Sequence, residues 1–445
     1  MQVDTVLLNA KIYMSQRILR AGLAIDNARI VKIARETNLP RASRQIDIEG
    51  SLVIPGLIDS HVHLRDQELA YREDFSTGSA AAAAGGVTTV VDMPNNRPVT
   101  MSAETLRKRM ELAERRIFVN TAFNSAFPST RSEIRDIVNQ GAAGFKLYLL
   151  QQIGGTDIDD DNALQNAFNE IAKANVPICV HAEDKAILEQ AKERMQRTGR
   201  NDSEAFLKAH PAAAESKAIQ HVAKLARNSG AHVHVCHVSS TAGLEAVSEA
   251  RKKDANVTCE VTPHHLLLSA DSMEQCGNIA LMLPPLRTKR DMEALWKALH
   301  KGTIDTIASD HAPHSLEEKT AKTVWDVKPG IAGLETLLPL MLNEVNRGRL
   351  TINQLVRLMA EKPAEIFHLE NRGSINEGFM ADLTVVDLKR EYKIDASRFH
   401  SKAKFSPFDG WKVKGKVVKT FVNGQLTMDE GEIVAKPGTG CVIRG

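Results

Sequence analysis

Four histidines and one aspartate of this sequence directly follow apolar runs, where a buried strand would end. His61 and His63 follow SLVIPGLIDS, His181 follows PICV, His237 follows VHVC, and Asp310 follows TIDTIAS. Imidazole nitrogens and carboxylate oxygens are the ligands that zinc and related divalent ions take. A single strand histidine is more often a hydrogen-bonded core residue than a ligand. Four of them at strand ends, together with an aspartate, favour a metal site.

Lys146 lies in the middle of the apolar run GFKLYLL, residues 144–150. Four histidines and one aspartate exceed what one catalytic zinc takes, whereas two ions that share a bridging hydroxide would use them all. Two ions ~3.5–4 Å apart need an anionic bridge, and a buried lysine loses its proton readily and can then add carbon dioxide. We therefore interpret Lys146 as a carboxylated, bridging ligand. The alternative is a lysine that extends to the mouth of the site or binds an anionic substrate directly.

The stretch AHVHVCHVSS holds three histidines, and only some of them can face the site. Strand alternation places His232 and His234 on one face with Cys236, and places His237 on the other face. His237 is the most C-terminal of the three, so we predict His237 as the ligand and a structural role for His232 and His234.

Arg65 follows His63 by two residues, as His63 follows His61. On a continuing strand, residues two apart point to the same face, so all three side chains would share it. The planar guanidinium of arginine suits two-point capture of a carboxylate. Arg65 is therefore a candidate for substrate binding, with an ordinary surface salt bridge as the alternative.

The elements that must position these residues alternate between strands and helices. Short apolar runs such as TTVVDM, VPICVHAE and TIDTIASDH alternate with amphipathic stretches such as AETLRKRMELAERR and DNALQNAFNEIAKAN. About eight such units predict an α/β fold, a (β/α)8 TIM-like barrel over residues 55–370 that carries its site at the C-terminal ends of the strands. A doubly wound sheet is the alternative, but no glycine-rich phosphate loop follows the first strand.

Both ends of the chain have the pattern of short antiparallel strands. Residues 1–54 and 371–445 hold short apolar runs separated by Asn and Gly, including a predicted turn at Asn423–Gly424. Each end is too small to fold well alone. We expect the two ends to pair into one small β-sandwich domain beside the barrel.

Composition excludes several classes of function. The chain has 57 basic and 55 acidic side chains and a net charge of +2, so it lacks the basic surface that nucleic acid or an anionic membrane would require. We find no signal peptide and no run of the ~20 apolar residues that a membrane span needs. The 5 scattered cysteines are typical of free thiols in a reducing cytosol, which predicts a cytoplasmic protein.

Several motifs together resemble a known family. PGLIDSHVHLR, VVDMPNN, GFKLYL, VHAED, CHVSS, TPHHL, PPLR, SDHAPH, GIAGLET and SPFDGWKVKGKVVKTFVNG are similar, in this order, to the amidohydrolase superfamily and within it to the dihydroorotase family. The resemblance runs over nearly the whole chain. It implies a barrel flanked by a composite β-sandwich, a homo-oligomeric assembly such as a dimer or tetramer, and reversible cyclisation of N-carbamoyl-L-aspartate to L-dihydroorotate in pyrimidine biosynthesis.

The resemblance also implies roles for individual residues. His61, His63 and Asp310 would hold one zinc ion, His181 and His237 the other, with carboxylated Lys146 between them. Asp310 would also move the proton during catalysis, because it would lie beside the attacking hydroxide. Substrate-contacting positions of the family correspond to Arg65, Asn95, His314, Pro329 and Gly330, whereas we expect a structural role for His264 and His265.

One position departs from the family pattern. Dihydroorotases commonly have Asn before PPLR, where this chain reads LMLPPLR with Leu283. A leucine side chain neither donates nor accepts a hydrogen bond, so one expected contact with the substrate ring is missing. The alternatives are a related cyclic amidase, such as an allantoinase, dihydropyrimidinase or hydantoinase, or a non-catalytic scaffold on the same fold. A scaffold would be expected to have lost ligands, whereas all six candidates are present here.

Overall fold

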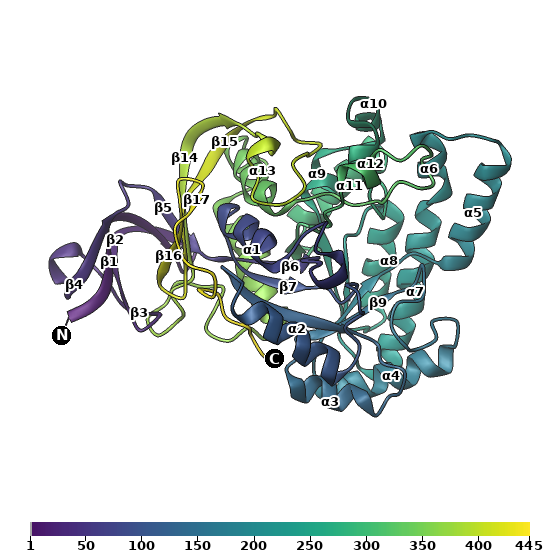
Figure 1. Cartoon of the computed structure of the whole chain (residues 1–445), viewed down its shortest axis with the longest axis horizontal. Helices are drawn as coiled ribbons and strands as arrows, with labels where there is room; N and C mark the ends of the chain where they lie inside the picture. Colours follow the sequence, from purple (N-terminus) through teal and green to yellow (C-terminus); the bar gives the residue numbers. More distant parts are fainter. Residues whose placement is uncertain (1) are drawn as a thin grey trace.

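Eight parallel strands form the central sheet of the computed structural model, which describes residues 2–445 (Figure 1). The strands lie side by side in chain order: β6 (Leu57–Val62), β7 (Val87–Asp92), β8 (Asn120–Ala126), β9 (Gly144–Tyr148), β10 (Ile178–His181), β11 (Val233–Val235), β12 (Val257–Val261) and β13 (Thr306–Ile307). The backbone N–H of His63 donates to the carbonyl of His311 at 2.8 Å, and this bond links the two ends of the sheet. The sheet is therefore a nearly closed barrel, and the predicted fold class is confirmed.

Helices follow most strands and lie outside the barrel (Figure 1). The longer ones are α1 (Phe75–Ala84), α2 (Ala103–Glu114), α3 (Glu133–Gln140), α4 (Asp161–Ala174), α5 (Lys185–Arg197), α6 (Ser203–Ala209), α7 (Ala212–Ser229), α8 (Thr241–Lys252), α11 (Lys289–His300) and α13 (Leu334–Asn346). Shorter ones are α9 (Pro263–Leu267), α10 (Met273–Cys276), α12 (Leu316–Lys319), α14 (Ile352–Val356) and α15 (Lys362–Ile366). The helix α4, for example, buries one apolar stripe, which contains Leu164, Phe168 and Ile171.

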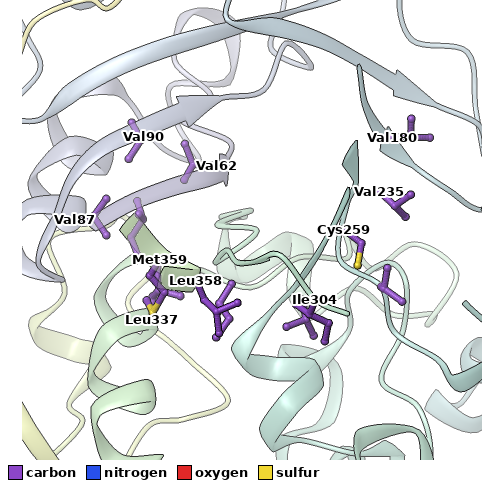
Figure 2. Packing of buried hydrophobic residues seen from close by; sticks show 14 of the residues in the cluster. Val62, Val87, Val90, Val180, Val235, Cys259, Ile304, Leu337, Leu358 and Met359 are labelled. Carbon is purple, nitrogen blue, oxygen red and sulfur yellow. The ribbon is translucent and has the colours of Figure 1, made fainter. Parts of the chain in front are cut away.

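The hydrophobic core extends from the barrel strands to the helical segment Arg357–Glu361. Val87 and Val235 of the barrel are fully buried, as are Leu358 and Met359 of the π-helical turn Arg357–Glu361 (Figure 2). This turn packs against both β6 and β13, the two end strands of the sheet. It therefore covers the place where the barrel is joined by few backbone hydrogen bonds.

The two ends of the chain form a second sheet of nine strands. It contains β1 (Gln2–Met14), β2 (Arg17–Asp26), β3 (Arg29–Ala34), β4 (Arg41–Asp47), β5 (Leu52–Pro55), β14 (Leu383–Lys393), β15 (Lys412–Val422), β16 (Gln425–Asp429) and β17 (Glu432–Ile433). β5 joins the two ends, because it pairs in parallel with β1 and antiparallel with β14. The prediction that both ends build one β unit beside the barrel is confirmed, while the domain limits at 54/55 and 370/371 stay predictions.

Smaller expectations can also be checked against the structure. Asn423 and Gly424 both have positive φ, 49° and 77°, and form the two-residue turn between β15 and β16. All five cysteines are free thiols. Within residues 2–445, every helix is too short or too polar to cross a bilayer.

Candidate metal centre and active site

The six predicted ligands come from the C-terminal ends of five barrel strands. His61 is in β6 and His63 follows it, Lys146 is in β9, and His181 ends β10. His237 and Asp310 lie two and three residues beyond the ends of β11 and β13. Because the carboxyl ends of all barrel strands meet at one rim, the structure brings the six side chains together there.

His61, His63 and Asp310 form the first group of possible ligands. The Oδ1 atom of Asp310 lies 3.3 Å from Nε2 of His61 and 3.2 Å from Nε2 of His63. The other ring nitrogens are engaged elsewhere: Nδ1 of His61 lies 2.5 Å from Glu260, and Nδ1 of His63 lies 2.6 Å from the Asn95 carbonyl oxygen. If each Nδ1–H donates its hydrogen bond, the lone pair of each ring lies on Nε2. Both Nε2 atoms and a carboxylate oxygen of Asp310 then lie close enough together to bind one metal ion.

His181 and His237 lie beside this group, and their ring centroids are 4.6 Å apart. The ring of His237 is 5.2 Å from that of His61. Nε2 of His181 lies 2.8 Å from the Glu183 carboxylate, whereas the buried Nδ1 of His237 has no hydrogen-bond partner. A buried imidazole nitrogen without a partner, on a ring beside other histidines, is a group that an ion could satisfy.

The reason given for His237 from strand alternation is wrong, although the side chain does lie in the cluster. Cys236, which alternation places opposite His237, also faces the barrel interior, since its sulfur lies 2.9 Å from Lys146 Nζ. His237 has a positive φ of 37°, and this left-handed residue breaks the alternation just after β11. His232 and His234 both hydrogen-bond Thr258, in keeping with their expected structural role.

Lys146 is fully buried at the centre of the cluster. Its Nζ lies 3.3 Å from Nε2 of His61, so the amine is among the histidines as expected. The pKa of Lys146 is raised, since the lowering that burial causes is offset by negative charge on Cys236 and Cys179. Burial raises the pKa of the Cys236 thiol well above its ordinary value, so this thiol is neutral at pH 7 and does not supply that charge. Burial alone favours the neutral amine, the form that reacts with carbon dioxide, whereas the negative charge of Glu260 favours the protonated form.

Sequence reasoning missed Glu260, a buried residue of β12. Its carboxylate lies 2.5 Å from Nδ1 of His61 and 3.1 Å from Nε2 of His234, and it accepts the backbone N–H of His237 at 3.2 Å. It therefore orients one predicted ligand and the backbone of another. The only sequence signal was a single acidic residue inside the apolar run VTCEV.

The donor set fits divalent metal ions. Burial lowers the pKa of His61, and it lowers the pKa values of His63 and His237 well below the ordinary range, so these imidazoles are neutral at pH 7. Neutral imidazole is the form that binds metal. His61, His63 and Asp310 would hold one ion, and His181 and His237 would hold the other, while Lys146 lies beside His61 of the first set.

A cavity of about 420 Å³ opens above this cluster, lined by all six residues and by Arg65, Asn95, Leu283, His314, Pro329 and Gly330. Arg65 reaches it for a different reason than predicted. The strand ends at Val62, and Arg65, Asp66 and Gln67 all have positive φ, between 52° and 58°. The buried Arg109–Asp92 pair fixes this turn, because Arg109 donates to the Arg65 carbonyl at 3.0 Å.

The Arg65 guanidinium is a buried cation without a carboxylate partner. Only 6% of the residue is exposed, its Nε has no hydrogen-bond partner, and no carboxylate of residues 2–445 lies within salt-bridge distance. One of its terminal nitrogens lies 3.5 Å from Nε2 of His314. A buried cation of this kind calls for an anion, which a ligand in the cavity would supply.

The other predicted substrate-contacting residues line the cavity but are partly engaged within the protein. The Asn95 carbonyl oxygen serves His63, so its amide N–H₂ group is left for a ligand. His314 lies 3.1 Å from the Pro329 carbonyl, and burial lowers its pKa to about 2. Gly330 donates its N–H to Leu281 at 2.8 Å, and a Cβ there would lie 2.4 Å from the Ala312 carbonyl oxygen, so only glycine fits.

His264 and His265 are buried in α9, which follows the C-terminal end of β12. His265 bonds Thr262 at 2.8 Å and the Pro284 carbonyl at 3.1 Å, as a structural histidine would. Leu283 lies on the cavity wall, so the departure noted in the sequence places an apolar side chain against any ligand.

Comparison with known proteins agrees with this geometry. The Amidohydrolase family profile matches residues 52–427. The chain belongs to the amidohydrolase family. It is 36% identical to an L-hydantoinase of Paenarthrobacter aurescens over 98% of this chain and 97% of the relative, and 37% identical to a dihydroorotase of Methanothermobacter thermautotrophicus over 95% and 94%. A solved L-hydantoinase (dihydropyrimidinase) from Arthrobacter aurescens superposes with a TM-score of 0.95 at 34% identity over 100% of both chains.

As an amidohydrolase of this kind, the protein is a hydrolase of cyclic amides with a metal-binding cluster at the barrel rim. Relatives of nearly equal identity bear two different names, dihydroorotase and L-hydantoinase. The two substrate classes differ in a carboxylate on the ring. The family alone therefore leaves the substrate to be decided by the residues of the cavity.

Proposed function

We propose that the protein is a dihydroorotase, which interconverts N-carbamoyl-L-aspartate and L-dihydroorotate in pyrimidine biosynthesis. The observation that carries the proposal is the buried, unpaired guanidinium of Arg65 in the wall of the metal-site cavity. Dihydroorotate has a ring carboxylate that would neutralise this charge. Hydantoin and dihydrouracil have none, and would leave a buried cation without a partner.

In this proposal two zinc ions would be held by the three residues of the first set, by His181 and His237, and by Lys146 in its carboxylated form. When bound, the ions supply a water of lowered pKa and polarise the ring carbonyl. Asp310 takes up the proton that is released as the amide is attacked, and delivers it to the ring nitrogen as that nitrogen leaves. In the biosynthetic direction Asp310 moves protons in the reverse order.

Binding and orientation fall to the cavity wall. Arg65 holds the carboxylate, the amide N–H₂ of Asn95 is free to donate to the ligand, and His314 lies beside Arg65 as a neutral imidazole. We further propose a cytoplasmic homo-oligomer, a dimer or tetramer, that acts on small molecules.

A hydantoinase is the second candidate, and Leu283 is the observation that favours it. An apolar side chain on the cavity wall suits a substrate whose ring carries an apolar substituent. The L-hydantoinase relative covers the chain as fully as the dihydroorotases do.

The test is a parallel assay of the purified, zinc-loaded protein and its Arg65→Met variant on dihydroorotate, hydantoin, dihydrouracil and allantoin. A dihydroorotase turns over dihydroorotate most efficiently and loses most of that activity in Arg65→Met, with unchanged zinc content. Preferential turnover of hydantoin, dihydrouracil or allantoin would contradict the proposal. Full turnover of dihydroorotate by Arg65→Met would remove its main support.

A further inference from the structure

Tyr148, the last residue of β9, is a polar residue of the cavity that has no role so far. It lines the cavity, and only 6% of the residue is exposed. Its ring lies nearly parallel to that of His181, at 25° with centroids 6.3 Å apart, and Lys146 Nζ lies 5.2 Å from the ring centre. The ring is therefore held in place by two predicted metal ligands.

The hydroxyl group of Tyr148 is buried and has no hydrogen-bond partner. A buried hydroxyl without a partner is costly, and such groups in a binding site commonly await a ligand. The buried Nε of Arg65, in the same cavity, is unpartnered as well. Both side chains therefore bring an unpartnered donor to the wall of one cavity.

These two donors complement one kind of ligand group. A carboxylate offers two oxygens that accept several hydrogen bonds, whereas a hydroxyl and a guanidinium can both donate. The side chain of Leu283 supplies no polar atom on the same cavity wall, whereas the phenol of Tyr148 does.

We propose that Tyr148 determines specificity by donating its hydroxyl hydrogen bond to the ring carboxylate that Arg65 holds. This inference rests on the proposed function, since it assigns a second donor to the same carboxylate. Removal of the hydroxyl should then weaken the binding of substrates that bear a carboxylate. Substrates without a carboxylate never make this hydrogen bond, so their affinity should change little.

The experiment compares wild type with Tyr148→Phe, which keeps the ring and its packing. Tyr13→Phe is the matched control, because Tyr13 also has a buried, unpartnered hydroxyl but lies in β1, outside the cavity. The readouts are kcat and KM for dihydroorotate and dihydrouracil, and the inhibition constants of orotate and uracil. Zinc content is measured for each variant.

For Tyr148→Phe we expect KM for dihydroorotate and the orotate inhibition constant to rise about tenfold or more, the loss typical of a hydrogen bond to a charged group. The change in kcat and in the dihydrouracil and uracil constants should be several-fold smaller, and Tyr13→Phe should match wild type. The inference would be overturned if Tyr148→Phe weakened the binding of compounds with and without the carboxylate equally. It would also be overturned if the orotate inhibition constant did not change.

Failure of the proposed function has a different signature. If wild type turns over dihydrouracil but not dihydroorotate, the dihydroorotase proposal is wrong. Inhibition of dihydrouracil turnover by orotate then still tests whether the Tyr148 hydroxyl binds a carboxylate. Inhibition that is about tenfold weaker in Tyr148→Phe supports the hydroxyl–carboxylate bond, and equal inhibition overturns it.

Discussion

At the scale of single residues, Glu260 couples three histidines of the barrel interior. Its carboxylate bonds His61 and His234 and accepts the His237 backbone N–H. These contacts keep His61 in the tautomer whose Nε2 faces Asp310. Burial opposes the charge of Glu260, but His61 and His234 lower its pKa well below the ordinary range.

We predict that Glu260→Gln lowers zinc affinity about 10–100-fold, because residues that orient metal ligands typically contribute this much. Titration of the metal-free protein with zinc in a competing chelator measures the affinity. Glu344→Gln is the control, since Glu344 is equally buried but pairs with Arg347 and Arg349, away from the cavity. Equal zinc affinity of Glu260→Gln and wild type would contradict the assignment.

The cluster of candidate ligands could be proposed from sequence at this scale, whereas the residues around it could not. Polar residues that follow apolar runs must meet at one barrel rim, so His61, His63 and Asp310 could be grouped without a structure. Lys146 could be added because it is a charged residue inside an apolar run. Glu260 lies inside β12 and Tyr148 is the last residue of β9, and neither was singled out by its pattern in the sequence. Glu260 bonds His61, 199 positions away, and only the folded barrel brings the ring of Tyr148 beside that of His181.

At the scale of elements, α12 supports the cavity wall through Lys319. This residue is fully buried, and its Nζ donates to the carbonyls of Leu281 at 2.8 Å and Gly330 at 3.0 Å. It ties together the two segments that carry Leu283 and Gly330 on the cavity wall. Burial lowers its pKa from 10.5 to about 7.

This shift predicts a pH-dependent stability. Between pH 7 and 10.5 the unfolded chain holds a proton on Lys319 that the folded chain releases, so the stability contributed by Lys319 rises with pH and is lost as pH falls through 7. Lys319→Met should therefore be more destabilising near pH 9.5 than near pH 7. Urea denaturation of both proteins at the two pH values measures this, with the exposed Lys322→Met as control. If Lys319→Met changed the free energy of unfolding equally at both pH values, the predicted pH dependence would be contradicted.

Element types were readable from sequence, but turn conformations were not. The period of apolar residues indicated β9 and α4 almost to their ends. The left-handed residues Arg65 and His237 were missed, because non-glycine residues rarely adopt positive φ and nothing in the sequence marks them. Both side chains nevertheless reach the rim, which is where these unusual turns direct them.

At the scale of the whole molecule, Asp382 joins the second sheet to the barrel. It lies just before β14 and accepts from Asn120 of β8 at 3.0 Å, from Arg372 at 3.1 Å and from the Asn423 backbone at 2.7 Å. Only 4% of its side chain and 11% of that of Arg372 are exposed. The pairing of both chain ends could be predicted from sequence, because neither end could bury its apolar residues alone. The polar contacts of Asp382 could not be predicted.

We predict that Asp382→Ala lowers the free energy of unfolding by about 3–5 kcal/mol, since it leaves Arg372 buried without its partner. Glu391→Ala removes an exposed ion pair with Lys414 and should cost about 1 kcal/mol or less. Chemical denaturation of the two variants compares these values. Similar small losses in both would show that the junction does not stabilise the fold.

The metal centre itself depends on Lys146, and it can be examined directly by reconstituting the metal-free protein with zinc and ¹³C-labelled bicarbonate. Carbon-13 NMR and metal analysis of the active protein should give one lysine carbamate and about two zinc ions per chain. Lys146→Ala should show neither the carbamate nor full zinc occupancy. Fully active wild-type protein with two zinc ions and no carbamate signal would contradict the account.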